Sequence, residues 1–286
     1  MTFADERGVR RRLKRIALVI AAIVLLGVGY RVIGVYRFRS GECSPRPARS
    51  FANTYPKHLV VMTYNIEGHA SLLKSQHIAE IAETIRKHHP DVVGLNEVHR
   101  GTWQARFGDH TRQLAKLTGM NVAFGRSYRF AGGDFGNAVL TRGQILSSEV
   151  HELPGYGEPR TLLETVIRVN GGTIELYVGH TVAWASLNEK ARGVQLQCMN
   201  RHVNASAYPY ILVGDLNAPP DSAEVARFLD VNTLQFAGNP KEPTHKVMGQ
   251  RLDYILTDPG WQTRSVHVLD EGPSDHRPVI AELVHP

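Results

Sequence analysis

Several short apolar runs in this chain end in a polar or acidic side chain, and this pattern restricts the fold more than any other feature. Asn65, Glu97, His180 and Asp215 each close such a run, and Asp275-His276 precedes another. Apolar runs of this length predict buried strands. Packing alone would not place carboxylates at their ends. If the strand ends gather at one sheet edge, these side chains would form a metal site of the kind that hydrolases use on phosphate esters.

The apolar runs alternate with helical segments from His58 onward. Strands are expected at residues 59–64, 91–95, 137–141, 145–153, 161–168, 173–180, 210–214, 252–256, 265–269 and 279–283. Helices are expected at 75–87 and 109–118, at 186–202 behind a capping box at Ser186, and after Asp221. Apolar and polar residues alternate at 173–180, which predicts a half-buried strand. Hairpins mixed with strand–helix units predict an α+β fold, with two packed sheets and helices outside.

The first 57 residues have a different character. Residues 1–15 form a basic tail, and residues 16–36 form an apolar run that would be about 30 Å long as a helix, enough to cross a bilayer. The basic flank predicts a cytoplasmic N-terminus. We therefore expect a single-pass anchor in the cell membrane, with the domain on the extracytoplasmic side. The alternative is a cleaved signal peptide with its apolar core at 16–26, which would give a secreted protein. Residues 37–57 are expected to be a linker.

The charge distribution also separates the tail from the rest. Residues 1–57 hold 12 of the 33 Lys and Arg residues but only 3 of the 27 Asp and Glu residues. Residues 58–286 therefore carry a net charge of −3 and lack the overall basic character of many nucleic-acid-binding domains. An exported domain could form a disulfide. However, Cys43 falls in the linker and Cys198 on an apolar helix face, so we expect Cys198 to be a core residue and no essential disulfide.

The polar residues at the strand ends have the chemistry of a hard metal site. Asp215 and Asn217 lie two apart on an extended chain, so their side chains should point the same way. Asn65 and Glu67 repeat this arrangement after the first strand. Carboxylate and amide oxygens favour Mg²⁺, with Mn²⁺ or Ca²⁺ as alternatives.

Two histidines at strand ends add groups that titrate near neutral pH. These residues, His180 and His276, could transfer protons. No candidate Ser or Cys nucleophile accompanies them. Oxygen ligands together with two histidines predict attack by water on phosphorus, with a metal ion neutralising charge.

Seven motifs together resemble those of the endonuclease/exonuclease/phosphatase superfamily, also called DNase I-like. They follow the family's order and are Tyr64-Asn65-Ile66-Glu67-Gly68, Val93-Gly94-Leu95-Asn96-Glu97, Gly136-Asn137-Ala138-Val139-Leu140, Gly179-His180-Thr181, Gly214-Asp215-Leu216-Asn217, Arg251-Leu252-Asp253-Tyr254-Ile255 and Ser274-Asp275-His276-Arg277-Pro278. The resemblance implies a four-layer α/β sandwich, with two stacked mixed sheets and a catalytic domain at 58–286. The family more often has Gln at the position of Asn96 and Leu at the position of Thr181, which leaves the subfamily open.

The resemblance also implies a role for each residue of the site. Its metal ligands would be Glu97, Asn65, Asp275 and Glu67. Its catalytic residues would be His276, oriented by Asp253, together with Asp215, His180 and Asn217. Asn137 is expected on the substrate side, or else as a structural residue of its strand. From its position in the chain, Arg160 could contact phosphate or lie on a solvated face.

The substrate class remains open at this stage. We expect a membrane-anchored phosphodiesterase, with a nuclease favoured over a phosphatase or a phosphodiesterase for phospholipid or sphingolipid head groups. A non-catalytic binding module on the same fold is a remote alternative, and no obligate protein partner is evident. His99 and His110 are expected at the surface. Trp103 is expected to pack, although from a loop it could touch substrate or lipid.

Overall fold

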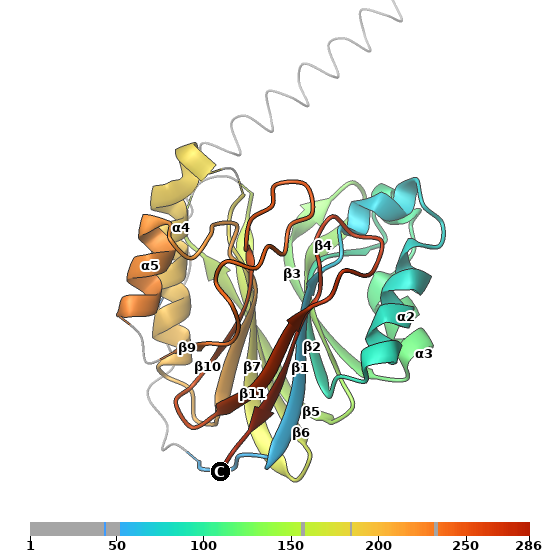
Figure 1. Ribbon diagram of the computed structural model, residues 1–286. Coiled ribbons are helices and arrows are strands. Elements are labelled where there is room, and N and C mark those ends of the chain that lie inside the picture. The colour runs from blue at the N-terminus through green and yellow to red at the C-terminus, as the bar shows by residue number, and fades with distance from the viewer. Residues whose placement is uncertain (1–42, 44–51, 156–157, 184, 232–233) are drawn as a thin grey trace, which may run out of the picture.

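The computed structural model describes residue 43 and residues 52–155, 158–183, 185–231 and 234–286, in which two six-stranded sheets stack face to face (Figure 1). In spatial order, the first sheet contains β11 (Gln262–Val268), β12 (Val279–Val284), β1 (His58–Asn65), β2 (Val92–Arg100), β4 (Gly133–Thr141) and β3 (Asn121–Phe130). The second contains β5 (Gln144–Leu153), β6 (Arg160–Val169), β7 (Gly172–His180), β8 (Tyr210–Asp215), β10 (Asp253–Thr257) and β9 (Gln235–Phe236). Each sheet is mixed, because β1 pairs in parallel with β2, and β7 with β8.

Helices cover the outer face of each sheet. The first sheet carries α2 (His77–His88) and α3 (His110–Thr118), and the second carries α4 (Ala185–Val203) and α5 (Ala223–Asp230), as Figure 1 shows. Two short 3₁₀ helices, η1 (Gly68–Leu72) and η2 (Trp103–Ala105), follow β1 and β2. This architecture confirms the predicted α+β class and the four-layer sandwich.

Three apolar layers hold the sandwich together. Side chains such as Val61 and Val178 fill the space between the sheets. Ile81 of α2 packs on the outer face of the first sheet, and Leu196 of α4 packs on that of the second. Burying a side chain of this size stabilises the fold by about 1.5–3 kcal/mol. Because successive side chains point to opposite faces of a sheet, each strand contributes side chains to two of these layers.

The helix limits follow from local chemistry that the sequence displays. Asp109 caps α3, because its side chain accepts a hydrogen bond from the backbone N–H of Arg112. Gly119 ends the same helix in the left-handed region at φ 72°, which glycine adopts without a steric penalty. The side chains of residues 185–188 lie outside the described part, and with them the capping box predicted at Ser186.

Two features of the sheets differ from the sequence expectation. Strand β3 and the two-residue β9 were not expected, because β3 is an edge strand with many polar residues and has no clear apolar alternation. The prediction of a half-buried strand at 173–180 was wrong. Glu175 and Tyr177 on its polar face are 5% and 1% exposed, because α4 covers that face.

The N-terminal predictions fall mostly outside the described residues. No helix in the described ranges is long and apolar enough to cross a bilayer. The basic tail at 1–15 and the anchor predicted at 16–36 are not among those residues. The last part of the predicted linker packs on the domain. There, Thr54 and Thr173 exchange backbone and side-chain hydrogen bonds, and the ring of Tyr55 lies 5.2 Å from that of Trp261.

A disulfide joins Cys43 to Cys198 of α4 across 155 residues of sequence. Cys198 is buried in the layer between α4 and the second sheet, as predicted. The expectation that it would remain an unpaired core residue was wrong. Just before β1, the backbone N–H of Ala52 donates to the carbonyl of Ala207, which precedes β8 of the second sheet.

Candidate active site

The strand directions gather the predicted site residues at one end of the sandwich, at the top of Figure 1. Asn65 ends β1 in the first sheet, and His180 and Asp215 end the parallel strands β7 and β8 in the second. The hydrogen bond from Asn65 to Asp215 places these strand ends at the same end of the sandwich. Asp253 begins the antiparallel β10 and pairs in register with Asp215. His276 lies in the loop that leads into β12, which is antiparallel to β1. The C-terminal ends of the parallel strands and the N-terminal ends of the antiparallel strands thus lie at the same end of the sandwich.

An irregularity in β2 aims Glu97 at the site. The pairing of β2 with β4 shifts register between Leu95 and Val98, and Glu97 has a φ of 59°, in the left-handed region. Such a bulge re-aims a side chain next to many active sites. Gly68 packs against this bend, because a Cβ at that position would lie 2.1 Å from the carbonyl oxygen of Glu97. Glycine is therefore required there.

The carboxylate of Asp215 lies at the centre of the site. Asn65 donates through Nδ2 to its Oδ2 at 3.0 Å, and the backbone N–H of Asn217 donates to its Oδ1 at 2.8 Å. The Nε2 atoms of His276 and His180 lie 3.7 and 3.8 Å from the same Oδ2. One carboxylate oxygen thus faces both imidazoles.

The contacts of the Nδ1 atoms hold the two imidazoles in different protonation states. Nδ1 of His276 donates to Oδ2 of Asp253 at 2.8 Å, which favours the imidazolium. Nδ1 of His180 lies 2.9 Å from Nη1 of Arg160. Because a guanidinium can only donate, Nδ1 of His180 must accept, and the ring proton is on Nε2. His180 is therefore a neutral donor, and the site contains one charged and one neutral imidazole.

The pKa values follow from this arrangement. Burial lowers the pKa of His276, but the charges of Asp253 and Asp215 outweigh it and raise that pKa to about 10. Burial and the charge of Arg160 hold the pKa of His180 well below its ordinary value. Burial raises the pKa of Asp215 to about 7, against the lowering effect of His276.

A second group of acidic side chains adjoins the centre. Asn65 Nδ2 also donates to Glu97 at 3.2 Å, so one amide joins Glu97 to Asp215. Glu67 accepts from the backbone N–H of Asp275 at 3.1 Å. Burial opposes ionisation of Glu97, but hydrogen bonding from His69 and nearby positive charge keep its pKa below the ordinary value.

The donor chemistry of this acidic group fits a hard divalent cation. Glu67, Glu97 and Asp275 are partly exposed, and the only ion-pair partners that the described residues offer them are histidines, at 3.7–3.8 Å. Partly exposed carboxylates without a lysine or arginine partner suit Mg²⁺ or Mn²⁺. At this end of the sandwich, the groups whose ligand atoms already lie within 4.8 Å of one another are Asp215, Asp253 and His276, and His245, Asp275 and His276. Asn65 turns its amide nitrogen toward Glu97, and its oxygen accepts from the N–H of Glu67 at 3.1 Å. To serve as a ligand, it would have to rotate this amide.

The side chains of two predicted site residues, Asn217 and Asn137, form hydrogen bonds within the protein. Asn217 donates through Nδ2 to the carbonyl of Thr181 at 3.0 Å, which ties β8 to β7. Asn137 is 1% exposed and lies between the sheets. It accepts from Asn96 at 2.9 Å and donates to the carbonyl of Thr161 at 3.0 Å. Asn137 thus lies behind the site, whereas Arg160 faces His180 directly.

Several residues at the site were not found from the sequence. His69 lies between Glu67 and Glu97, and His245 packs on His276 with ring centroids 4.6 Å apart. Asn96 accepts from the backbone N–H of Asp215 at 3.0 Å, which links β2 in the first sheet to β8 in the second. His69 directly follows Gly68, the last residue of the first motif, and this position was the only sign in the sequence that it would lie at the site. His245 had none.

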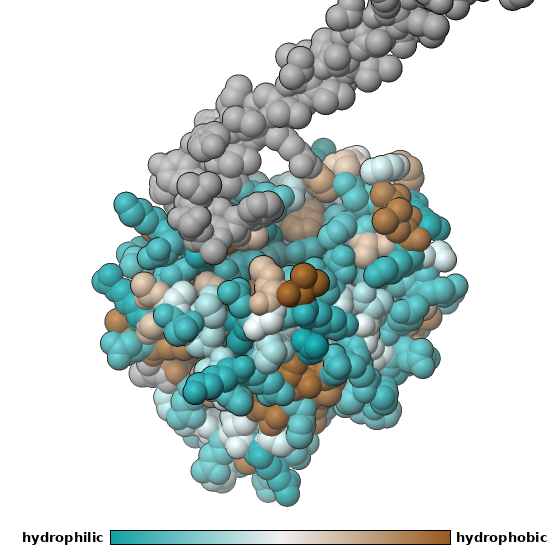
Figure 2. Space-filling model, turned by 45° about the horizontal axis from the view of Figure 1, so that its top comes forward, coloured by the Kyte–Doolittle hydropathy of each residue, from teal (hydrophilic) through white to brown (hydrophobic). Residues whose placement is uncertain are grey.

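Exposed apolar side chains stand on the loops around the site. Leu73, Trp103 and Phe107, from the segments of η1 and η2, are 87%, 55% and 69% exposed. Val247 and Met248 are exposed on the loop that contains His245. Figure 2 shows a largely hydrophilic surface at this end, with separate apolar patches. Trp103 is therefore not the packing residue that we expected.

Arginines accompany the two exposed aromatic rings. Arg100, Arg106, Arg126 and Arg129 are exposed on β2, on the η2 loop and on the β3–β4 hairpin. The hairpin joins the η2 loop directly, because the N–H of Trp103 donates to the carbonyl of Ala131 at 2.9 Å. Arginines and aromatic rings thus share one side of the rim.

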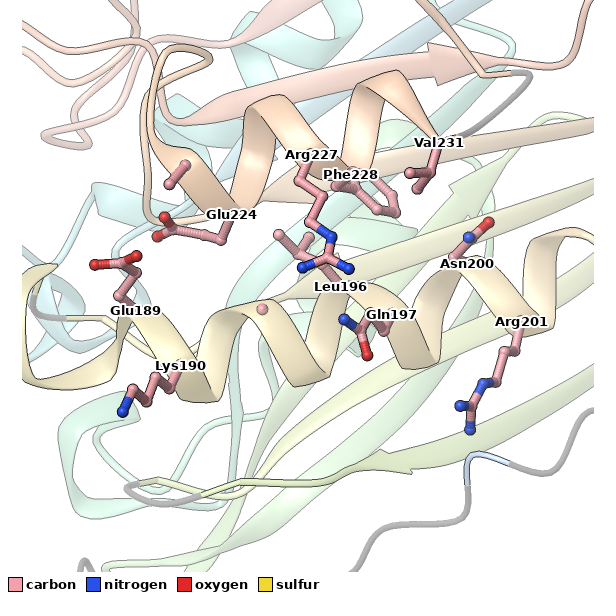
Figure 3. A pocket seen from close by; sticks show the side chains of 12 residues that line it. Glu189, Lys190, Leu196, Gln197, Asn200, Arg201, Glu224, Arg227, Phe228 and Val231 are labelled. Atoms are coloured by element: carbon pink, nitrogen blue, oxygen red, sulfur yellow. The ribbon is translucent and has the colours of Figure 1, made fainter.

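A groove elsewhere on the surface contains none of the predicted site residues. It lies between α4 and α5 on the outer helix layer, with Leu196 and Phe228 among its lining residues (Figure 3). Charged side chains such as Lys190 and Arg227 surround it. The candidate active site is instead the polar group of side chains at the strand ends.

Comparison with known proteins identifies the fold and the family. No curated protein sequence matches the chain significantly. An endonuclease/exonuclease/phosphatase protein from Beutenbergia cavernae is 24% identical, with a TM-score of 0.67 over 80% of this chain and 72% of that one. D. rerio TDP2 complexed with single-strand DNA product is 18% identical, with a TM-score of 0.66 over 79% and 98%. A mannosyl-6-phosphatase from Bacteroides thetaiotaomicron is 19% identical, with a TM-score of 0.64 over 79% and 99%.

At these identities, the structural neighbours establish the fold alone. The sequence model of the Endonuclease/Exonuclease/phosphatase family matches residues 62–276, which include Glu97 and His276 and make up most of the chain. The chain therefore belongs to the endonuclease/exonuclease/phosphatase family of phosphoester hydrolases.

Proposed function

We propose that this protein is a divalent-metal-dependent phosphodiesterase that cleaves nucleic acid by attack of water on phosphorus. The observation that carries the proposal is the position of Asp215, whose Oδ2 faces His276 and His180 and is joined to Glu97 through Asn65. A proton acceptor, two imidazole donors and an acidic cation site thus adjoin one another. Such a set serves phosphoryl chemistry better than acyl chemistry, because it contains no side-chain nucleophile.

Each group has a task that follows from its contacts. Asp215 accepts a proton from the attacking water, and Asn217 holds this carboxylate through its backbone N–H. His276, kept charged by Asp253, donates through Nε2 to the phosphate or the leaving oxygen. His180, with its proton on Nε2, donates to a phosphate oxygen as negative charge develops.

Glu97, Glu67 and Asp275 would hold the cation. When bound, Mg²⁺ or Mn²⁺ would neutralise negative charge on the phosphate oxygens. Asn65 would join these ligands if its amide oxygen turned toward Glu97.

Nucleic acid is the favoured substrate because of the rim beside the site. Exposed Trp103 and Phe107 can stack on bases, and stacking of this kind contributes about 1–3 kcal/mol per base. Arg106 and Arg129 beside them can contact backbone phosphates. This local arrangement supports a nuclease, although the folded region has no overall positive charge.

A lipid head-group phosphodiesterase is the second candidate. It is favoured by the exposed aliphatic residues Leu73, Val247 and Met248, which would insert into a membrane surface. The proposed membrane anchor at 16–36 would hold the site near such a surface. The disulfide between Cys43 and Cys198 supports an extracytoplasmic location for the domain, because disulfides persist in oxidising compartments.

Two assays with and without EDTA separate the candidates. We expect plasmid nicking that requires Mg²⁺ or Mn²⁺, and no release of phosphocholine from sphingomyelin or phosphatidylcholine vesicles. Replacing Trp103 and Phe107 with alanine should raise the KM for DNA about tenfold or more. The matched control is Leu146→Ala. Leu146 is exposed at the end of β5 that lies away from the site, so its replacement should leave the KM for DNA unchanged. Phosphocholine release without nicking would favour the lipid candidate and overturn the nuclease.

A further inference from the structure

A buried polar cluster lies outside the candidate active site, between the second sheet and the C-terminal half of α4. It consists of His151 on β5, Glu164 on β6, Glu175 on β7 and His202 on α4. All four residues are less than 9% exposed. Charged and titratable side chains are rarely buried without a partner that balances them.

Three members of the cluster converge on one point. Nε2 of His151 lies 2.8 Å from Oε2 of Glu164. The ring of His202 stacks on that of His151, with centroids 4.0 Å apart and 28° between the planes. One ligand atom from each of these three residues lies within 4.8 Å of the others. Small side-chain rotations would bring all three within bonding distance of a single ion.

The fourth member adds negative charge. Glu175 lies beside Glu164, and its carboxylate accepts hydrogen bonds from the hydroxyl of Ser206 and the N–H of Ala207. Two carboxylates buried together repel each other, and two stacked imidazolium rings would also do so. A divalent cation bound between these residues would offset the negative charge of both carboxylates.

The donor set selects the kind of ion. Two imidazole nitrogens and a carboxylate oxygen form the His₂Glu set that binds Zn²⁺, whereas the candidate active site offers mainly oxygen. A small cavity of about 20 Å³, lined in part by Glu164, Glu175 and His202, adjoins the cluster. This space holds about one water molecule, which could serve as the fourth ligand.

We propose that His151, Glu164 and His202 form a Zn²⁺ site that fastens the C-terminal half of α4 to the second sheet. Cys198, one helical turn before His202, already fastens the same helix to the segment before β1. The site is structural, because it lies on the outer face of the sheet and away from the strand ends that form the catalytic group. It would stabilise the folded protein through the free energy of metal binding.

Zinc binding to the purified full-length protein tests this proposal. The background is Glu97→Gln, which we expect to weaken metal binding at the candidate active site, and which lies outside the proposed zinc site. After bound metal is removed with a chelator, the protein is incubated with Zn²⁺ and dialysed, and elemental analysis should then give about one Zn²⁺ per chain. The Tm should rise by about 5 °C or more at a free Zn²⁺ concentration of about 100 times Kd. Co²⁺ should show the visible absorption bands of a tetrahedral nitrogen and oxygen site.

Histidine variants make the test specific. His151→Gln and His202→Gln, each in the same background, should lose the Zn²⁺-dependent rise in Tm and the Co²⁺ bands. A cooperative unfolding transition in the chelator shows that each variant is folded. The matched control is His58→Gln, which removes a half-exposed histidine paired with Glu282 and should keep the full response. The proposal is overturned if the background protein binds no Zn²⁺, or if both cluster variants retain the full response.

Discussion

Asp253 accepts a 2.8 Å hydrogen bond from Nδ1 of His276, and it pairs in register with Asp215, whose Oδ2 faces the other nitrogen of the same ring. His276 is therefore held between two carboxylates. Both carboxylates are buried, and Asp253 makes the direct hydrogen bond to the ring, whereas Oδ2 of Asp215 lies 3.7 Å from Nε2. We therefore propose that Asp253 orients the imidazole and that Asp215 exchanges protons.

Replacing Asp253 with asparagine should lower kcat about a hundredfold or more. The change keeps the side-chain volume but removes the charge that maintains the imidazolium, and proton transfer of this kind contributes about 10²–10⁴ in rate. The measurement is kcat on a phosphodiester, together with the Tm. Asp258→Asn is the control, because Asp258 is also buried but binds the N–H of Tyr210 at the far end of β10. It should lower stability and leave kcat unchanged, and an equal loss of kcat in both variants would contradict the assignment.

Replacing Glu97 with glutamine should raise the Mg²⁺ concentration for half-maximal activity about tenfold or more. The change removes a charged oxygen ligand from the acidic group while keeping its shape. The measurement is a Mg²⁺ titration of the rate. Glu83→Gln on the exposed face of α2 should titrate like the unmodified protein. An unchanged titration for Glu97→Gln would remove this residue from the cation site.

The position of His110 predicts sensitivity to acid. His110 is 1% exposed and lies 3.1 Å from the hydroxyl of Ser71 through Nε2. Burial lowers its pKa to about 3, whereas an unfolded chain binds this proton near pH 6.5. The unfolded state therefore gains a proton first as the pH falls. This difference should lower the free energy of unfolding by about 1.4 kcal/mol per pH unit between pH 6.5 and 3.

Urea unfolding at pH 6.5, 5.5 and 4.5 measures this contribution. The slope for His110→Gln should be smaller by about 1.4 kcal/mol per pH unit. The exposed His267→Gln is the control and should keep the original slope. Identical slopes for all three proteins would show that His110 is not the acid-sensitive group.

The disulfide between Cys43 and Cys198 should contribute about 2–5 kcal/mol to stability, because it closes a long loop in the unfolded chain. Cys43→Ala removes the bond and leaves the buried Cys198 in place. The free energy of unfolding should fall by this amount, and a reducing agent should lower the stability of the unmodified protein equally. The reducing agent should not affect Cys43→Ala. If oxidised and reduced proteins were equally stable, the bond would have no structural role.

The sequence predicted which residues gather at the strand ends, because strand direction determines where strand ends lie. Asn65, Glu97 and Asp215 follow apolar runs, and sequence periodicity identifies such runs well. The order and direction of the strands in the two mixed sheets are then enough to bring these residues together. The roles of these residues in catalysis remain predictions until variants are assayed.

The features that the sequence did not reveal depend on segments without periodicity. His99 and His110 were expected at the surface, yet both are 1% exposed, because the loops around η1 and η2 close over them. The partner of Cys198 is Cys43, which stands in a stretch of sequence with no repeating pattern. His245 reaches the site from a loop whose sequence shows no motif. In each case, long-range packing decides the position.

Hydrolysis of bis(p-nitrophenyl) phosphate tests the central claim most directly. The purified protein should release p-nitrophenol with Mg²⁺ or Mn²⁺ and stop in EDTA, and His276→Ala should lose at least about 99% of the rate while unfolding cooperatively. If His276→Ala retained the full rate in saturating metal, or if hydrolysis proceeded equally in EDTA, the site at the strand ends would not be a metal-dependent phosphodiesterase centre.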